Sequence, residues 1–278
     1  MTLIIATTTP DGVVLTADSR QTYVNRSGLP RIASDNATKI IQLTETAVVA
    51  TAGTAFFFDS GKQKSIQAYL HEFRDSGVLE DLATTDAVAS ALDVYCQEWI
   101  ERIMKASIVE IVAAEKGIDL VFEPIVDGKL PYRYKDAGGQ EQRKEWFLST
   151  VSFIVAGRDP DGSCHAINVL PFGPTGVRST SDTPNLQWIG QAEVINKLFG
   201  GQDYFILSLA TMTIQDAVDF SILLTRTTEN VQKFSDGIAG SQGGIPGVGG
   251  PIDVVWIPRN GPMKWLSQKT LNAEGARP

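Results

Sequence analysis

The first twenty residues, MTLIIATTTPDGVVLTADSR, constrain the fold more than any other stretch of the chain. Two short apolar runs flank Pro10-Asp11-Gly12, a tripeptide typical of a tight turn. Runs rich in Val, Ile and Thr on both sides of such a turn predict a β-hairpin. We therefore expect paired strands over 2–8 and 13–18, so that a sheet begins at the second residue.

The rest of the chain divides into alternating batches of strands and helices. Apolar residues recur at helical spacing over 55–73 and 86–112, and again over 192–199 and 204–230. Between and after these stretches the pattern returns to short strands. Antiparallel strands with two batches of helices predict an α+β fold, a four-layer αββα sandwich in which two stacked sheets carry helices on each outer face.

No internal repeat or linker divides the sequence, so residues 1–278 are expected to form a single domain. Residues 113–146 are polar and rich in turn residues, which predicts a surface insertion. Residues 235–251, SDGIAGSQGGIPGVGGP, predict a glycine-rich loop. Its glycines precede a strand and no Gly-Lys-Ser/Thr follows, so the loop does not match a nucleotide-binding fingerprint.

Charge and composition argue against several classes of function. The net charge is −8 and the pI about 4.9, with no basic run, which disfavours a nucleic-acid partner. The two cysteines have no CxxC spacing, so neither a disulfide framework nor a metal site is expected. There is no signal-peptide pattern and no apolar run long enough to span a bilayer. We expect a cytoplasmic protein without a membrane partner.

Thr2 is the candidate nucleophile. Initiator methionine is usually trimmed before a small residue, and Thr2 would then carry a free α-amine beside its hydroxyl. Such a pair is one way to build a nucleophile with its own base. An α-amine has a pKa of about 7.7–8.0, so it is partly neutral near pH 7 and can accept the hydroxyl proton. The mechanism also needs a nearby cation, an acid to hold that cation, and a backbone N–H for the oxyanion.

Three residues could fill these roles. Asp18 ends the strand that is predicted to pair with the strand after Thr2, so its carboxylate is expected near Thr2. Lys39 directly precedes an apolar strand. Gly53 ends a strand, where the missing side chain lets a substrate carbonyl approach the backbone. Taken singly, each could be a strand-end acid, a surface lysine or a turn glycine, but together they favour the catalytic interpretation.

These residues resemble the proteasome β-type subunits and bacterial homologues such as HslV, members of the N-terminal nucleophile (Ntn) hydrolases. That family begins with threonine, continues with a strand, an Asp-Gly turn, a strand and a D-S-R-x-T stretch, and has a lysine before one strand and a glycine after the next. The resemblance is strong over 2–55 and looser over 147–257. The matching residues are Thr2, Asp11-Gly12, Asp18-Ser19-Arg20, Thr22, Lys39 and Gly53.

The resemblance implies a threonine endopeptidase that forms a Thr2 acyl-enzyme once Met1 has been removed. Lys39 would lower the proton affinity around Thr2, Asp18 would orient Lys39, and the Gly53 N–H would form the oxyanion hole. Thr22 and Gly53 would bind the extended backbone of the substrate. The family's first specificity pocket falls at Gln21, Ala37 and Thr51.

The chain departs from the family pattern at two places. Gln191-Ala192 stand where the family usually has a serine. The family's Asp-x-x-Ser pair is matched only by Asp236 and Ser241, in a longer loop. Asp236 is kept as a candidate catalytic residue.

The resemblance also implies a homo-oligomeric ring with its active sites inside. The expected substrate is a peptide or an unfolded protein, an ATPase partner is possible, and no metal or organic cofactor is expected. Two alternatives stay open: a small-amide Ntn hydrolase or peptide ligase, and a catalytically inactive scaffold with a proteasome-like fold.

Overall fold

The structure is a computed structural model, and it describes residues 2–25, 27–59, 61–148, 151–173, 176–199, 208–235 and 245–269. The predicted opening hairpin is confirmed. Strand β1 (Leu3–Thr9) pairs antiparallel with β2 (Gly12–Asp18), with Ile4 opposite Ala17. The turn needs glycine at position 12, because its φ is +139° and a Cβ there would lie 2.1 Å from the Ile257 carbonyl oxygen.

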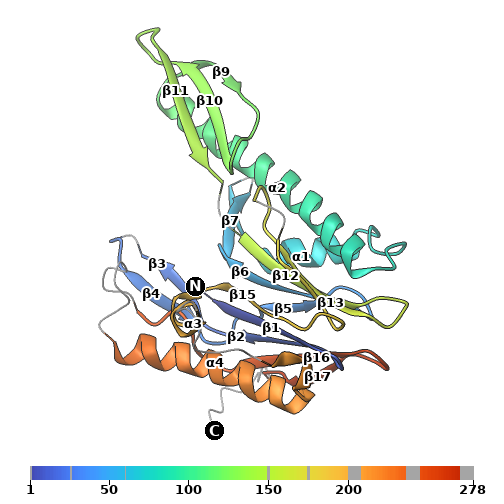
Figure 1. The fold of residues 1–278 in the computed structure, drawn as a ribbon. Coiled ribbons are helices and arrows are strands. Elements are labelled where there is room, and N and C mark those ends of the chain that lie inside the picture. Colours follow the sequence, from blue (N-terminus) through green and yellow to red (C-terminus); the bar gives the residue numbers. More distant parts are fainter. Residues whose placement is uncertain are drawn as a thin grey trace, which may run out of the picture.

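The hairpin lies in the middle of an antiparallel five-stranded sheet of order β15-β1-β2-β16-β17. Helix α4 (Ile214–Phe234) contacts β1 and β2, and α3 (Glu193–Phe199) packs beside α4 (Figure 1). The remaining strands are β15 (Leu186–Gly190), β16 (Ile252–Pro258) and β17 (Lys264–Ser267).

A second antiparallel sheet of five strands has the order β14-β13-β12-β6-β5. Its strands are β5 (Ile40–Gln42), β6 (Ala47–Gly53), β12 (Val151–Arg158), β13 (Cys164–Val169) and β14 (Arg178–Thr180).

Two helices accompany the second sheet. Helix α2 (Thr85–Ala114) contacts β12 and β13. It begins where the Thr84 side chain accepts a hydrogen bond from the Ala87 N–H, and the Ser65 side chain caps α1 (Ile66–Asp75) in the same way. Although α2 has 30 residues, no helix within the described ranges combines the length and the apolar character that a bilayer span requires.

Alternating side chains of β1 explain why the strand is buried throughout. Ile4 and Ala6 pack against Val48 and other residues of the second sheet, whereas Leu3 and Ile5 pack in a separate cluster that includes Leu224 of α4. Successive side chains of a strand point to opposite faces, so β1 contributes to two apolar layers at once.

Three small sheets complete the described structure. Strand β3 (Gln21–Val24) pairs with β4 (Pro30–Ser34), and β7 (Phe56–Asp59) pairs with β8 (Lys62–Ser65). The third sheet has the order β11-β10-β9 and packs against the C-terminal end of α2 (Figure 1). Its strands are β9 (Ile118–Phe122), β10 (Lys129–Lys135) and β11 (Glu141–Phe147), and a short 3₁₀ turn spans Leu209–Thr211.

The predicted four-layer αββα sandwich is wrong. Among the described residues antiparallel strand (39%) exceeds helix (29%), and the strands form five separate sheets where the prediction has only two. The physical reason is local pairing. The segments that form the three small sheets, for which the sequence analysis predicts no strands, fold back at tight turns and pair with themselves.

The segment predicted as an insertion, residues 113–146, contains the end of α2 and most of the β9–β11 sheet. Its status as an insertion and the single-domain organisation of residues 1–278 remain predictions. Most of the predicted glycine-rich loop, residues 236–244, lies outside the described residues.

Candidate active site

Thr2 lies immediately before β1, and its backbone is held by the end of β15. The Gln191 N–H donates to the Thr2 carbonyl oxygen at 2.7 Å. Gly190 has a φ of +95°, and a Cβ at that position would lie 1.9 Å from the same oxygen. Glycine is therefore required where β15 crosses Thr2. The whole residue is only 6% exposed.

Asp18, the last residue of β2, is fully buried and accepts four hydrogen bonds. Its Oδ1 accepts from the Leu3 N–H at 2.9 Å and from Lys39 Nζ at 2.7 Å. Its Oδ2 accepts from the N–H groups of Arg20 at 3.1 Å and Gly249 at 3.0 Å. A buried carboxylate needs such partners to remain charged. Asp18 thus ties the residue after Thr2 to the lysine.

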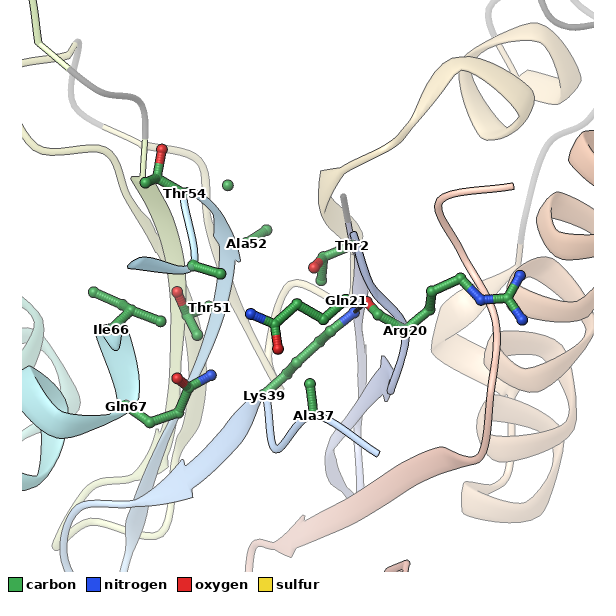
Figure 2. Close-up of a pocket in the computed structure, with 12 residues that line it drawn as sticks. Thr2, Arg20, Gln21, Ala37, Lys39, Thr51, Ala52, Thr54, Ile66 and Gln67 are labelled. Atoms are coloured by element: carbon green, nitrogen blue, oxygen red, sulfur yellow. Dashed lines mark hydrogen bonds between the residues drawn. The ribbon is translucent and has the colours of Figure 1, made fainter. Parts of the chain in front are cut away.

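Lys39 extends from the segment before β5 into the space beneath Thr2 (Figure 2). It is 4% exposed, and its Nζ donates to Asp18 Oδ1 and, at 2.6 Å, to the Arg20 carbonyl oxygen. Burial lowers the pKa of the Lys39 ammonium from its ordinary value, and the neighbouring Asp18 carboxylate opposes that shift. The result is a desolvated cation with a fixed direction.

A small cleft brings most of the predicted site residues together. Gly53 stands at its rim with a φ of +104°, a backbone conformation that favours glycine. Figure 2 shows Thr2 and Gln21 on one side of the cleft and Thr51 with the start of α1 on the other. The residues that line the cleft are Thr2, Arg20, Gln21, Ala37, Lys39, Thr51, Ala52, Gly53, Thr54, Ala55, Ile66 and Gln67.

Three predicted residues are not among the described residues that line the cleft. Asp18 does not line the cleft but accepts a hydrogen bond from Lys39, which does. Thr22 follows Gln21 on β3 but is not among the residues that line the cleft. Asp236 lies outside the described residues, as does Ser241. The catalytic and binding roles of all nine candidate residues remain predictions.

The structure adds a link that the sequence did not reveal. On α4, Gln232 donates through Nε2 to Gln191 Oε1 at 2.8 Å. Its Oε1 accepts from the N–H groups of Gly247 and Val248, both at 3.0 Å. The adjoining Gly249 is the residue that donates to Asp18. Gln232 therefore connects the strand end that holds Thr2 to the loop that holds Asp18.

The sequence indicates the parts of this link to different degrees. Gln191 was visible in the sequence as a departure from the family pattern at a strand end. The glycine-rich stretch was visible only as a loop, and its contact with Asp18 depends on the tertiary fold. Nothing in the local pattern around Gln232 distinguishes it from any other glutamine on an amphipathic helix.

The arrangement combines a hydroxyl-bearing residue, a desolvated cation held by a buried carboxylate, and a glycine backbone around one cleft. Nucleophilic attack on a carbonyl needs such groups: a hydroxyl to attack, a nearby positive charge, and a backbone N–H for the oxyanion. Among the described residues there is no cluster of three or more metal-ligating side chains.

Comparison with known proteins identifies a fold relative. No protein-family model matches the chain, and no curated protein matches it. Among solved structures, the chain is similar to a Gly-1 mutant of Anbu from Hyphomicrobium sp. strain MC1, with a TM-score of 0.56 at 17% sequence identity. The match covers 96% of this chain and 87% of that chain.

At this identity the likeness shows the fold alone. The chain therefore shares the general fold of that Anbu structure. The predicted resemblance to proteasome β-type subunits of the HslV kind is wrong, because the structural match is to Anbu rather than to HslV. The motifs matched at the start of the chain are too few to separate HslV from other proteins that share this fold.

Proposed function

We propose that the chain is an amide hydrolase that cleaves peptide bonds, with Thr2 as its nucleophile after removal of Met1. One observation carries the proposal. Lys39 Nζ, held 2.7 Å from the buried Asp18 carboxylate, faces a cleft that Thr2 and Gly53 also line. A lysine on a surface strand end would be solvated and unpaired, and this one is neither.

In the proposed reaction, Thr2 Oγ1 attacks the carbonyl carbon while its proton passes to the α-amine of Thr2. The oxyanion accepts a hydrogen bond from the Gly53 N–H. The C–N bond then breaks, the leaving amine takes the proton, and the acyl group remains as an ester on Thr2. Water attacks the ester, the α-amine again acts as base, and the carboxylic acid is released.

Lys39 and Asp18 support these steps electrostatically. A positive charge near Thr2 stabilises the hydroxyl oxygen as it loses its proton and favours the neutral α-amine. Asp18 keeps that charge in place, and its bond to the Leu3 N–H fixes the backbone on which Thr2 sits. Thr22 and Gly53 would bind the substrate backbone, and Gln21, Ala37 and Thr51 its side chain.

Mass spectrometry tests the proposal directly. Protein made in a bacterial host should lack Met1, and a β-lactone should add one acyl group to Thr2. Methionine is also trimmed before Ala and Ser, so Thr2→Ala should lose Met1 but take no label, whereas Thr2→Ser keeps a hydroxyl and should be labelled. Retention of Met1 in protein that cleaves peptides would contradict the mechanism.

The other outcomes separate the alternatives. Labelling without peptide cleavage would favour a small-amide hydrolase, or a ligase if added amines are captured by the acyl ester. Loss of Met1 with no label would favour an inactive scaffold. We further propose that copies of the chain form a ring; any ATPase partner stays a prediction.

A further inference from the structure

Two glutamine side chains reach into the cleft from opposite walls. Gln21 comes from β3, and Gln67 comes from the first turn of α1 (Figure 2). The sequence analysis expects Gln21 in a specificity pocket, but nothing in it points to Gln67. The hairpin of β7 and β8 precedes α1 and sets the position from which Gln67 enters.

The hydrogen bonds of Gln67 fix the orientation of its carboxamide. Gln67 Nε2 lies 2.8 Å from the Thr38 carbonyl oxygen, which can only accept, so the nitrogen must face Thr38. The Oε1 and the second N–H of Gln67 are then the groups that a ligand can reach. Within the described part of the chain, the Gln21 carboxamide has no hydrogen-bond partner.

The charges around the cleft disfavour ionised side chains. None of the described lining residues is acidic, and the two cations, Arg20 and Lys39, are paired with acids that do not line the cleft. A substrate lysine or arginine would meet like charge with no carboxylate in reach. A substrate carboxylate would lose its hydration to approach Lys39, which already donates to Asp18 and to a backbone carbonyl.

From these contacts we infer that the cleft selects an uncharged carboxamide side chain next to the scissile bond, with Gln67 as a specificity-determining residue. The inference rests on the proposed function. A carboxamide offers a donor and an acceptor to Gln67 and Gln21, whereas an apolar side chain leaves both glutamines without the hydrogen bonds they make to water. A site built for hydrogen bonds rejects an analogue that lacks them.

A matched substrate series tests this selectivity. Four fluorogenic peptides would differ only in the residue before the scissile bond, which is Gln, Glu, Met or Lys, because these side chains have similar lengths. The Gln peptide should be cleaved with a kcat/KM about tenfold above that of the Met peptide, equivalent to the loss of one or two neutral hydrogen bonds. The Lys peptide should be the slowest.

Variants assign the effect to Gln67. In Gln67→Met the Gln-to-Met ratio of kcat/KM should fall about tenfold, towards one. Gln63→Met is the control, because Gln63 is exposed on β8 and does not line the cleft, and its ratio should stay at the wild-type value. Labelling of Thr2 by the β-lactone confirms that each variant keeps its nucleophile.

Two kinds of result would overturn the inference, and they are distinguishable. If wild-type protein is labelled at Thr2 but prefers the Met, Glu or Lys peptide, or if Gln67→Met keeps the ratio, the selectivity is wrong and the proposed function stands. If no peptide is cleaved and no label is taken, both fail together.

Discussion

At the scale of single residues, the Asp18 carboxylate is fully buried and holds one ammonium and three backbone N–H groups. Three of those donors belong to different segments, the start of β1, the stretch before β5 and the loop before β16. A side chain that draws three segments together makes both a structural and an electrostatic contribution. Removing Lys39 therefore affects more than the cleft.

We expect Lys39→Met to destabilise the fold by about 3–5 kcal/mol, because it leaves the buried Asp18 charge without its cation. The double variant Lys39→Met/Asp18→Asn removes both charges and should recover part of that loss. Urea unfolding monitored by circular dichroism measures both values. Additive losses in the double variant would mean that the two side chains do not stabilise one another.

At the scale of elements, the hydrogen bonds of Gln232 connect α4 to the candidate site. We expect Gln232→Ala to lower kcat about tenfold with little change in KM, because the strand end that holds Thr2 loses its link to the loop that holds Asp18. Steady-state kinetics with a cleaved peptide measures the split.

A matched control lies on the same helix. Gln215 bonds to Asp219 one turn along the exposed face of α4, so Gln215→Ala should keep both constants. A purely structural role for Gln232 predicts instead that kcat and the fraction of folded protein fall together, while a defect in substrate binding predicts that KM rises.

The hairpin and the strands of the site could be predicted because their signals are local. Apolar runs around Pro10-Asp11-Gly12 set β1 and β2, and residues at strand ends placed Asp18, Lys39 and Gly53 around one point. The helix predicted over 55–73 is wrong for residues 55–65, because apolar phenylalanines there fit a helical spacing although the segment contains a turn. Gly61 has a φ of +76° and closes the hairpin of β7 and β8, so α1 begins only at Ile66.

Other features could not be predicted, because they depend on partners that are distant in the sequence. The β3–β4 hairpin closes at a turn where Asn25 Oδ1 accepts from the Leu29 N–H, in a stretch for which the sequence analysis predicts no strand. The contacts of Gln232 and Gly249 join α4, the end of β15, the loop before β16 and the end of β2, and Gly249 is 231 residues from its partner Asp18. No local propensity encodes such contacts.

At the scale of the whole molecule, the described surface carries large apolar side chains beside the cleft. On the β3–β4 hairpin, Val24 is 68% exposed, Tyr23 50% and Ile32 44%. Apolar groups gathered on one projecting hairpin are unusual for a protein that works as a monomer, since monomers keep such patches small. The hairpin also carries Gln21 and Thr22, so whatever covers it lies close to the cleft.

We therefore expect the protein to assemble through copies of itself. Size-exclusion chromatography with light scattering, at micromolar concentration, should give a mass that is a whole multiple of 30.1 kDa and at least several chains large. Val24→Lys should reduce that mass, because a charge buried at an interface without a partner is unfavourable, whereas the same change at the exposed Val94 of α2 serves as the control. A wild-type mass of 30.1 kDa at all concentrations would exclude a ring and leave the cleft open to solvent, which fits a small-amide substrate better than an unfolded protein.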